Sequence, residues 1–275
     1  MKKIAGILLI IFLFLHISCK KNLPDANNDI QSVLDNICAD DAMDGVFTTI
    51  NDYATNYLGK KGTLIDSNSI VTISPQFPLD SFPKTMIIDY GNGVYCTDGK
   101  TRKGKIIAVL NKRWIIDSIT NGLTAEVTTE KYIIDNDQLA GSFIITFNGN
   151  SDNQPSFTVN TSNAKLTFEN GENTQWIANK TTKWISGFEN INDINDDVFL
   201  ITGNNTGINR KGLGYEADII SPLRYEVGCL GGTVTQGKLE IIPQDISKRT
   251  LNFGDGDCDK IAKVTINGVT VDISF

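Results

Sequence analysis

Most of the chain shows a period-two pattern of apolar and polar residues. Residues 143–147, 262–266 and 269–275 alternate between apolar side chains and Thr, Lys, Asp or Ser. Such alternation places one side of a strand against a core and the other in water, which is typical of antiparallel sheets. We therefore expect residues 60–275 to form a mainly β domain, an antiparallel meander in one large curved or two-layer sheet.

Asn-Gly pairs separate several of these alternating segments. They begin at residues 92, 121, 148, 170 and 267. Both central residues of a type I′ turn need a positive φ, which Asn and Gly tolerate, so this dipeptide is a strong hairpin signal. The sequence predicts one hairpin over residues 166–185, turning at Asn170-Gly171, and another over residues 264–275, turning at Asn267-Gly268.

Residues 29–59 carry a helical pattern. Five apolar residues recur there at helical spacing: Val46, Ile50, Tyr53, Ala54 and Tyr57. Gly59 follows as a C-terminal cap. We expect three acidic residues to lie near the helix start, where the macrodipole favours carboxylates: Asp40, Asp41 and Asp44. Because the polar face is acidic rather than basic, the helix should pack on the sheet rather than on a membrane surface.

The N-terminus has the plan of an export signal. Lys2 and Lys3 precede an apolar run over residues 4–17, which is shorter than the roughly 20 residues of a membrane-spanning helix. Ser18-Cys19 closes the run and resembles a bacterial lipobox, although His16 stands where Leu or Val is usual. We predict a lipoprotein signal peptide at residues 1–18, a lipidated Cys19 and a tether over residues 19–28. Ordinary secretion with Cys19 lost or free is the alternative.

Lipidation implies a location and a first partner. Acyl chains on Cys19 would bind the protein to a membrane of the bacterial cell envelope, and we expect this to be the outer membrane. The sequence does not indicate whether the protein lies on the periplasmic or the surface face. After the signal, the sequence has no second apolar run of 18 residues. The body of the protein should therefore lie outside the bilayer.

Four cysteines remain beyond Cys19, and they are widely spaced. An even number in an exported protein suggests disulfides rather than a redox or metal site, for which a C-x-x-C spacing would be expected. Tracing the meander places Cys229 and Cys258 at the same end of neighbouring hairpins, so we predict a disulfide between them. Cys38 and Cys96 are left as a second pair or as two buried thiols.

Charge and histidine content exclude several classes of function. The only histidine is His16, inside the predicted signal, so a mature chain would lack the imidazole of Ser-His-Asp catalysis and of His-ligated metal sites. Removing residues 1–18 takes away Lys2 and Lys3 and no acid, and moves the formal charge from −7 to −9. Such an acidic surface repels phosphates, so we expect no nucleic-acid partner.

Six segments together resemble a known group of proteins: Phe82-Pro83-Lys84-Thr85, Asp89-Tyr90-Gly91, residues 99–107, residues 197–203, Asn209-Arg210-Lys211-Gly212 and residues 253–259. The chain is similar, over most of residues 40–275, to a group of exported Bacteroidetes-type lipoproteins. The resemblance implies a lipid-anchored envelope protein. It implies no particular activity.

Two motifs resemble ligand-binding loops, but their sequences favour structural roles. Gly99 to Lys105 has the spacing of a phosphate-binding loop, but the Ser or Thr that should follow is Ile106 and the pattern continues as a strand. Asp255, Asp257 and Asp259 alternate like the start of a calcium loop, yet the Gly and Glu that such a loop needs are missing. We identify no metal site and no cofactor.

No catalytic residue stands out among the 32 acidic side chains. Trp176 and Trp184 would share one face of a strand, either as a sugar-stacking platform or as core. We expect an envelope lipoprotein that is a non-catalytic binding or structural module, with a glycan or an envelope protein as its ligand. The alternatives are a polysaccharide hydrolase that uses two carboxylates and a carrier of an apolar ligand in a curved sheet.

Overall fold

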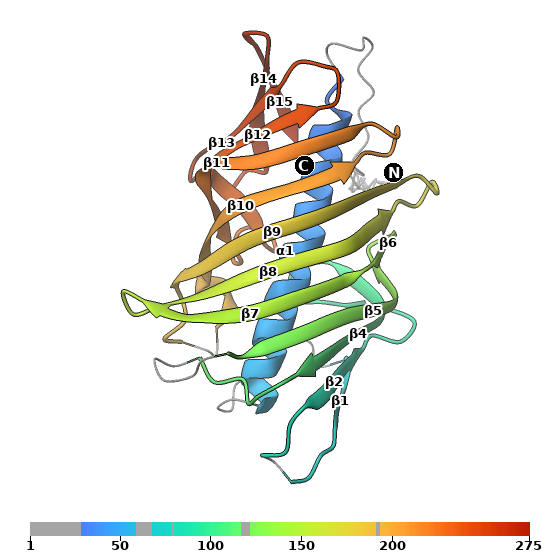
Figure 1. The fold of residues 1–275 in the computed structure, drawn as a ribbon, viewed down its shortest axis with the longest axis vertical. Coiled ribbons are helices and arrows are strands. Elements are labelled where there is room, and N and C mark those ends of the chain that lie inside the picture. Colours follow the sequence, from blue (N-terminus) through green and yellow to red (C-terminus); the bar gives the residue numbers. More distant parts are fainter. Residues whose placement is uncertain (1–28, 59–67, 79, 117–121, 191–192) are drawn as a thin grey trace, which may run out of the picture.

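A long helix crosses the concave side of a large antiparallel sheet (Figure 1). The computed structural model describes residues 29–58, 68–78, 80–116, 122–190 and 193–275. The helix is α1 (Gln31–Leu58), and the short 3-10 helix η2 spans Ile194–Asp196. The sheet strands follow α1 in sequence, so the expected fold class, a mainly β antiparallel meander with one N-terminal helix packed on it, is confirmed.

The sheet contains fifteen strands within these described residues. They are β1 (Ile70–Ser74), β2 (Lys84–Asp89), β3 (Val94–Tyr95), β4 (Thr101–Leu110), β5 (Thr124–Ile134), β6 (Asp137–Ala140), β7 (Ser142–Ser151), β8 (Gln154–Thr167), β9 (Asn173–Ser186), β10 (Val198–Ile208), β11 (Gly214–Glu226), β12 (Thr233–Pro243), β13 (Arg249–Asp255), β14 (Ile261–Ile266) and β15 (Val269–Ser274). From β8 to β15 each strand pairs with the next in the chain. Consecutive pairing of this kind needs only short turns.

Both predicted hairpins are present. β8 and β9 join through the turn at Asn170-Gly171, and β14 and β15 join at Asn267-Gly268, where both residues have positive φ. Asn148-Gly149 behaves differently, because it lies inside β7, where the pairing with β8 shifts register. Gly149 has a positive φ there. The same dipeptide can therefore make a bulge within a strand when the flanking strands continue past it.

The helix is buried along most of its length by the sheet that curves around it. Val46, Ile50 and Tyr53 are each 2% exposed or less, as the helical spacing predicts; the side chain of Tyr57 and the predicted cap Gly59 lie outside the described part of the chain. Phe47 contacts the rings of Phe157 and Phe199 edge-on. The apolar face of α1 is thus fixed by aromatic residues of the inner sheet face.

The expectation that the acidic residues of α1 lie near its start was wrong. α1 begins at Gln31, so Asp40, Asp41 and Asp44 stand well inside it. The charges of Asp40 and Asp41 are met by lysines outside the helix instead of by the macrodipole. Asp40 lies 2.5 Å from the ammonium of Lys180 and accepts hydrogen bonds from the amides of Asn205 and Asn36. Since both Asp40 and Lys180 are buried, each charge needs the other.

Further ion pairs hold the helix along its length. Asp35 accepts hydrogen bonds from the backbone and the guanidinium of Arg210, in the turn between β10 and β11. Asp41 pairs with Lys100, which precedes β4. At the helix start, the guanidinium of Arg249 on β13 donates two hydrogen bonds to the carbonyl oxygen of Asp29. The helix is therefore bound to distant strands by polar contacts as well as by its apolar face.

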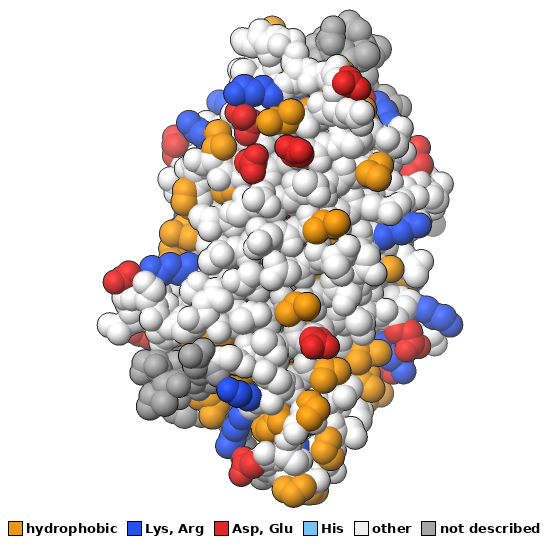
Figure 2. All heavy atoms as spheres, viewed as in Figure 1, with side chains coloured by type: hydrophobic (Ala, Val, Ile, Leu, Met, Phe, Trp, Pro, Cys, Tyr) orange, Lys and Arg blue, Asp and Glu red, His pale blue; other side chains and the backbone are white. Residues whose placement is uncertain are grey.

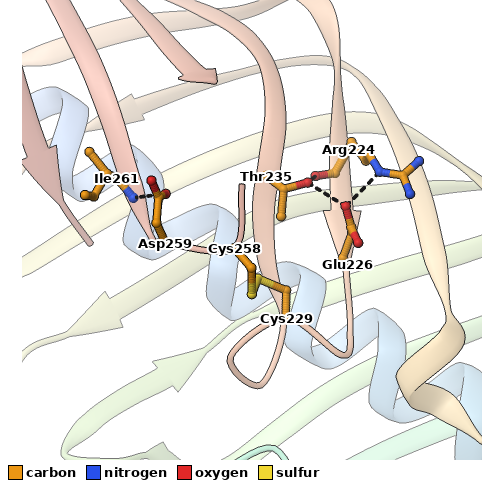
Figure 3. The surroundings of a disulfide bond; sticks show 7 residues. All are labelled: Arg224, Glu226, Cys229, Thr235, Cys258, Asp259 and Ile261. Carbon is orange, nitrogen blue, oxygen red and sulfur yellow. Dashed lines mark hydrogen bonds and ion pairs between the residues drawn. A yellow bond between two sulfur atoms is a disulfide. The ribbon is translucent and has the colours of Figure 1, made fainter. Parts of the chain in front are cut away.

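The predicted disulfide joins Cys229 to Cys258 (Figure 3). It links the loop after β11 to the loop after β13, and the two Cα atoms are 5.6 Å apart. Figure 3 shows it beside the Arg224, Glu226 and Thr235 contacts of β11 and β12. Cys38 and Cys96 are both thiols, as the second alternative expects, but only Cys96 is buried and Cys38 is half-buried.

The outer face of the central sheet carries little charge. A row of threonines crosses five paired strands, with partly exposed side chains: Thr124, Thr146, Thr158, Thr181 and Thr202. Figure 2 shows this side, where most of the central surface is neither charged nor hydrophobic. These threonines make up part of this uncharged central surface.

Candidate functional site

The site residues expected from sequence do not gather in one place. Cys19 lies outside the described residues, so its lipidation remains a prediction. Cys229 and Cys258 form a structural bond. Trp176 and Trp184 share one face of β9, but that face is the inner one, and they are only 2% and 4% exposed. They belong to the core and do not form a sugar-stacking platform.

A partly open cavity of about 50 Å³ lies between the middle of α1 and the inner face of the sheet. This is room for about four water molecules. Three groups of residues line it: Gly45, Thr48, Thr49, Asn51, Asp52, Tyr53 and Thr55 from α1; Cys96, Asp98, Lys100 and Arg102 from the corner before β4 and its start; and Trp184, Asn190, Asp193, Ile194, Asp197, Phe199, Tyr225, Val227 and Gly231 from β9 to the loop after β11.

Gly45 opens the helix side of this cavity. It stands in the middle of a helix that is otherwise tightly enclosed, yet a Cβ atom at this position would meet nothing within 4 Å. Glycine inside a helix costs about 1 kcal/mol relative to alanine. Since no neighbouring atom requires glycine here, its effect is to leave the helix backbone open to the cavity.

The basic residues of the lining are already neutralised. Arg102 donates hydrogen bonds to both carboxylate oxygens of Asp98, and Lys100 forms its ion pair with Asp41. Burial acts to raise the pKa of Asp98, but the hydrogen bonds and charge of Arg102 hold it below its ordinary value. Asp98 is therefore a carboxylate at neutral pH and belongs to a fixed ion pair.

The corner that carries Asp98 is held against the disulfide loop. Gly231 has a positive φ, and a Cβ atom there would collide with the carbonyl oxygen of Asp98. Only glycine allows this backbone approach. The basic side of the cavity is thus positioned by backbone packing onto the loop that contains Cys229.

The opposite side of the cavity is acidic. Asp197 is 8% exposed, and one of its carboxyl oxygens accepts a hydrogen bond from the indole of Trp184 at 3.1 Å. Burial raises the pKa of Asp197 to about 8, and the negative charges of Asp196, Asp52 and Asp193 act in the same direction. Asp197 is therefore largely protonated at neutral pH, because nearby negative charges disfavour its ionised form.

Tyr225 completes the lining with a polar atom that has no partner in the described residues. The side chain is 5% exposed, and its hydroxyl makes no hydrogen bond to any described residue. The pKa of Tyr225 is well above its ordinary value because of burial and the nearby charges of Asp41 and Asp44. The hydroxyl therefore stays neutral and is available to a guest in the cavity.

Sequence reasoning did not find this site. An isolated glycine within a helical pattern was the one signal available, because such a glycine usually has a packing or functional reason. Nothing in the local sequence distinguishes Asp197 or Tyr225. Their role depends on strands β10 and β11 meeting the middle of α1.

Comparison with protein-family models, curated proteins and solved structures found no match for this chain. The described helices include none that is long and apolar enough to cross a membrane. The site is therefore interpreted from its own geometry.

We predict that Asp197→Asn stabilises the protein more strongly as the pH rises. The folded pKa of about 8 lies above the ordinary value of 3.8 for an aspartic acid. The unfolded chain therefore loses its proton first, and the stability of the native protein falls as the pH rises between these two values. Asn cannot ionise and still offers an oxygen to the Trp184 indole. Thermal unfolding at about pH 5 and about pH 9 should show the larger gain at the higher pH.

Glu189→Gln, which removes an exposed carboxylate from the loop after β9, is the matched control and should show no such trend. An equal gain for Asp197→Asn at both pH values would show that Asp197 is ionised throughout.

Proposed function

We propose that the protein is an envelope lipoprotein that acts as a non-catalytic binding module and holds a small polar group in the cavity at Gly45. The observation that carries the proposal is the open space at Gly45, in a helix whose surroundings are otherwise filled. The hydroxyl of Tyr225 supports it, because Tyr225 lines the cavity and a hydroxyl can both donate a hydrogen bond to a polar guest and accept one from it.

The size of the cavity favours binding over the two alternatives. A carrier of an apolar ligand would need a large apolar space, but α1 occupies the concave side of the sheet. A polysaccharide hydrolase needs room for a sugar between two carboxyl groups about 5 to 10 Å apart. Asp197 and Asp52 do line the same space, but it holds only about four water molecules.

The anchoring part of the proposal rests on Cys19. Residues 19–28 would connect it to Asp29, which Arg249 holds at the start of α1. A fully extended tether of this length reaches about 35 Å. The end of the sheet that carries Arg249 and the turn at Lys211, which pairs with Asp29, would then be the end nearest the membrane.

A graded substitution series at Gly45 tests the binding site. Gly45→Ala should raise stability by up to about 1 kcal/mol, because alanine is the better helix former, and Gly45→Leu should fill the cavity. Full-length protein in detergent micelles would be screened by thermal shift against small cationic, neutral and anionic solutes. We expect at least one solute to stabilise the wild type and to lose this effect progressively from Ala to Leu.

A screen without hits would contradict the binding function, as would a solute whose stabilising effect is equal in all three proteins. Because Gly45→Ala is expected to make the fold more stable, loss of binding in this variant cannot be attributed to unfolding.

Anchoring is tested separately. Cys19→Ala removes the thiol that would be acylated, so we expect the protein to move from the membrane fraction to the soluble fraction, since α1 cannot span a bilayer. Cys38→Ala, which removes a thiol from the helix, is the control and should stay with the membranes. An unchanged membrane fraction for Cys19→Ala would refute the lipid anchor but would not contradict the proposed binding in the cavity.

A further inference from the structure

Acidic residues outnumber basic ones in the lining of the Gly45 cavity, although Asp197 itself is largely protonated at neutral pH. Four aspartates and two basic residues line it, and both basic residues already hold a carboxylate, since Lys100 pairs with Asp41 and Arg102 with Asp98. Among the described residues, no lysine or arginine forms an ion pair with Asp193 or Asp197. A cationic guest would therefore be favoured over a neutral or an anionic one.

Aromatic rings flank the acidic side. Trp184 and Phe199 both line the cavity and stack with their centroids 5.5 Å apart. The indole N–H of Trp184 is committed to Asp197, which fixes the orientation of the ring. Aromatic faces attract cations, most strongly where water is displaced. The combination of carboxyl groups with aromatic rings is suited to an organic cation.

The dimensions of the space limit the guest to a small group. Room for about four water molecules admits an ammonium nitrogen with two or three carbon atoms. An ammonium group has three donors, and the acceptors that line the space include the carboxyl groups of Asp193 and Asp197 and the hydroxyl of Tyr225. The open backbone at Gly45 leaves space for the methylene groups.

We propose that this cavity binds a primary alkylammonium group, with the nitrogen on the side of Asp193 and Asp197 and the alkyl part against Gly45. The proposal rests on the binding function proposed above and names its ligand class. Binding would place a positive charge beside Asp197 and favour its ionised form, so the guest and this carboxylate would stabilise each other.

The probe is ethylammonium chloride, titrated into the full-length protein in detergent micelles with sodium chloride to keep the ionic strength constant. The readout is the NMR signal of the Trp184 indole N–H, assigned by its loss in Trp184→Phe. We expect this signal to shift and saturate with ethylammonium but not with ethanol or acetate. Asp197→Asn and Gly45→Ala should each raise the Kd at least about tenfold.

Glu189→Gln is the matched control for charge. Glu189 is exposed and lies in the loop after β9 but does not line the cavity, so its substitution should change the Kd by less than about threefold. Equal losses in Glu189→Gln and Asp197→Asn would overturn the proposal, because they would indicate attraction by net charge alone. A different outcome is that ethanol binds saturably, that this binding is lost in Gly45→Ala, and that ethylammonium has no effect. This outcome would contradict the proposed ligand class but would support the binding function.

Discussion

The buried pair of Asp40 on α1 and Lys180 on β9 is the contact on which the rest of the structure depends. A helix enclosed by a sheet has little solvated surface on which to place its polar residues, and α1 carries several carboxylates in its middle. Each must find a cation or a hydrogen-bond donor on the inner sheet face, or become protonated. Lys180, Arg210 and Lys100 supply the cations from three separate parts of the chain. Asp44 has no such partner within the described part of the chain, and its burial raises its pKa to about 7.

These pairs also decide where the cavity lies. They fix α1 at Asp35, Asp40 and Asp41, and aromatic rings fix it at Phe47. Between these contacts and the loop that contains Asp197, the sheet stands away from the helix, and Gly45 offers no side chain to fill the space. The cavity therefore lies between helix α1, the inner face of the sheet and the loops that carry Gly231 and Asp197. A preformed site of this kind loses little conformational entropy when a ligand binds.

Sequence patterns predicted features that depend on neighbouring residues, such as hairpin turns. They did not predict the contacts of α1 with residues far away in the chain. Alternation and turn residues predicted the hairpins at Asn170-Gly171 and Asn267-Gly268, and tracing the meander was enough to pair Cys229 with Cys258. The sequence pattern wrongly put the acidic residues of α1 near the helix start, because the helix extends beyond the part with the most regular apolar spacing. It also could not show their partners, which lie far away in sequence. The sequence does not decide between core and platform for Trp184, since strand periodicity indicates which residues share a face but not which face is covered.

The most direct test of this account is a double-mutant cycle on Asp40 and Lys180, with stability measured by denaturant unfolding. Asp40→Asn and Lys180→Met should each cost about 3 to 5 kcal/mol, because each leaves the other charge buried without its partner. The double variant should be more stable than the sum of these losses predicts by at least about 1 kcal/mol. Strictly additive losses would contradict the account, since they would show that the helix is held in the sheet without this ion pair.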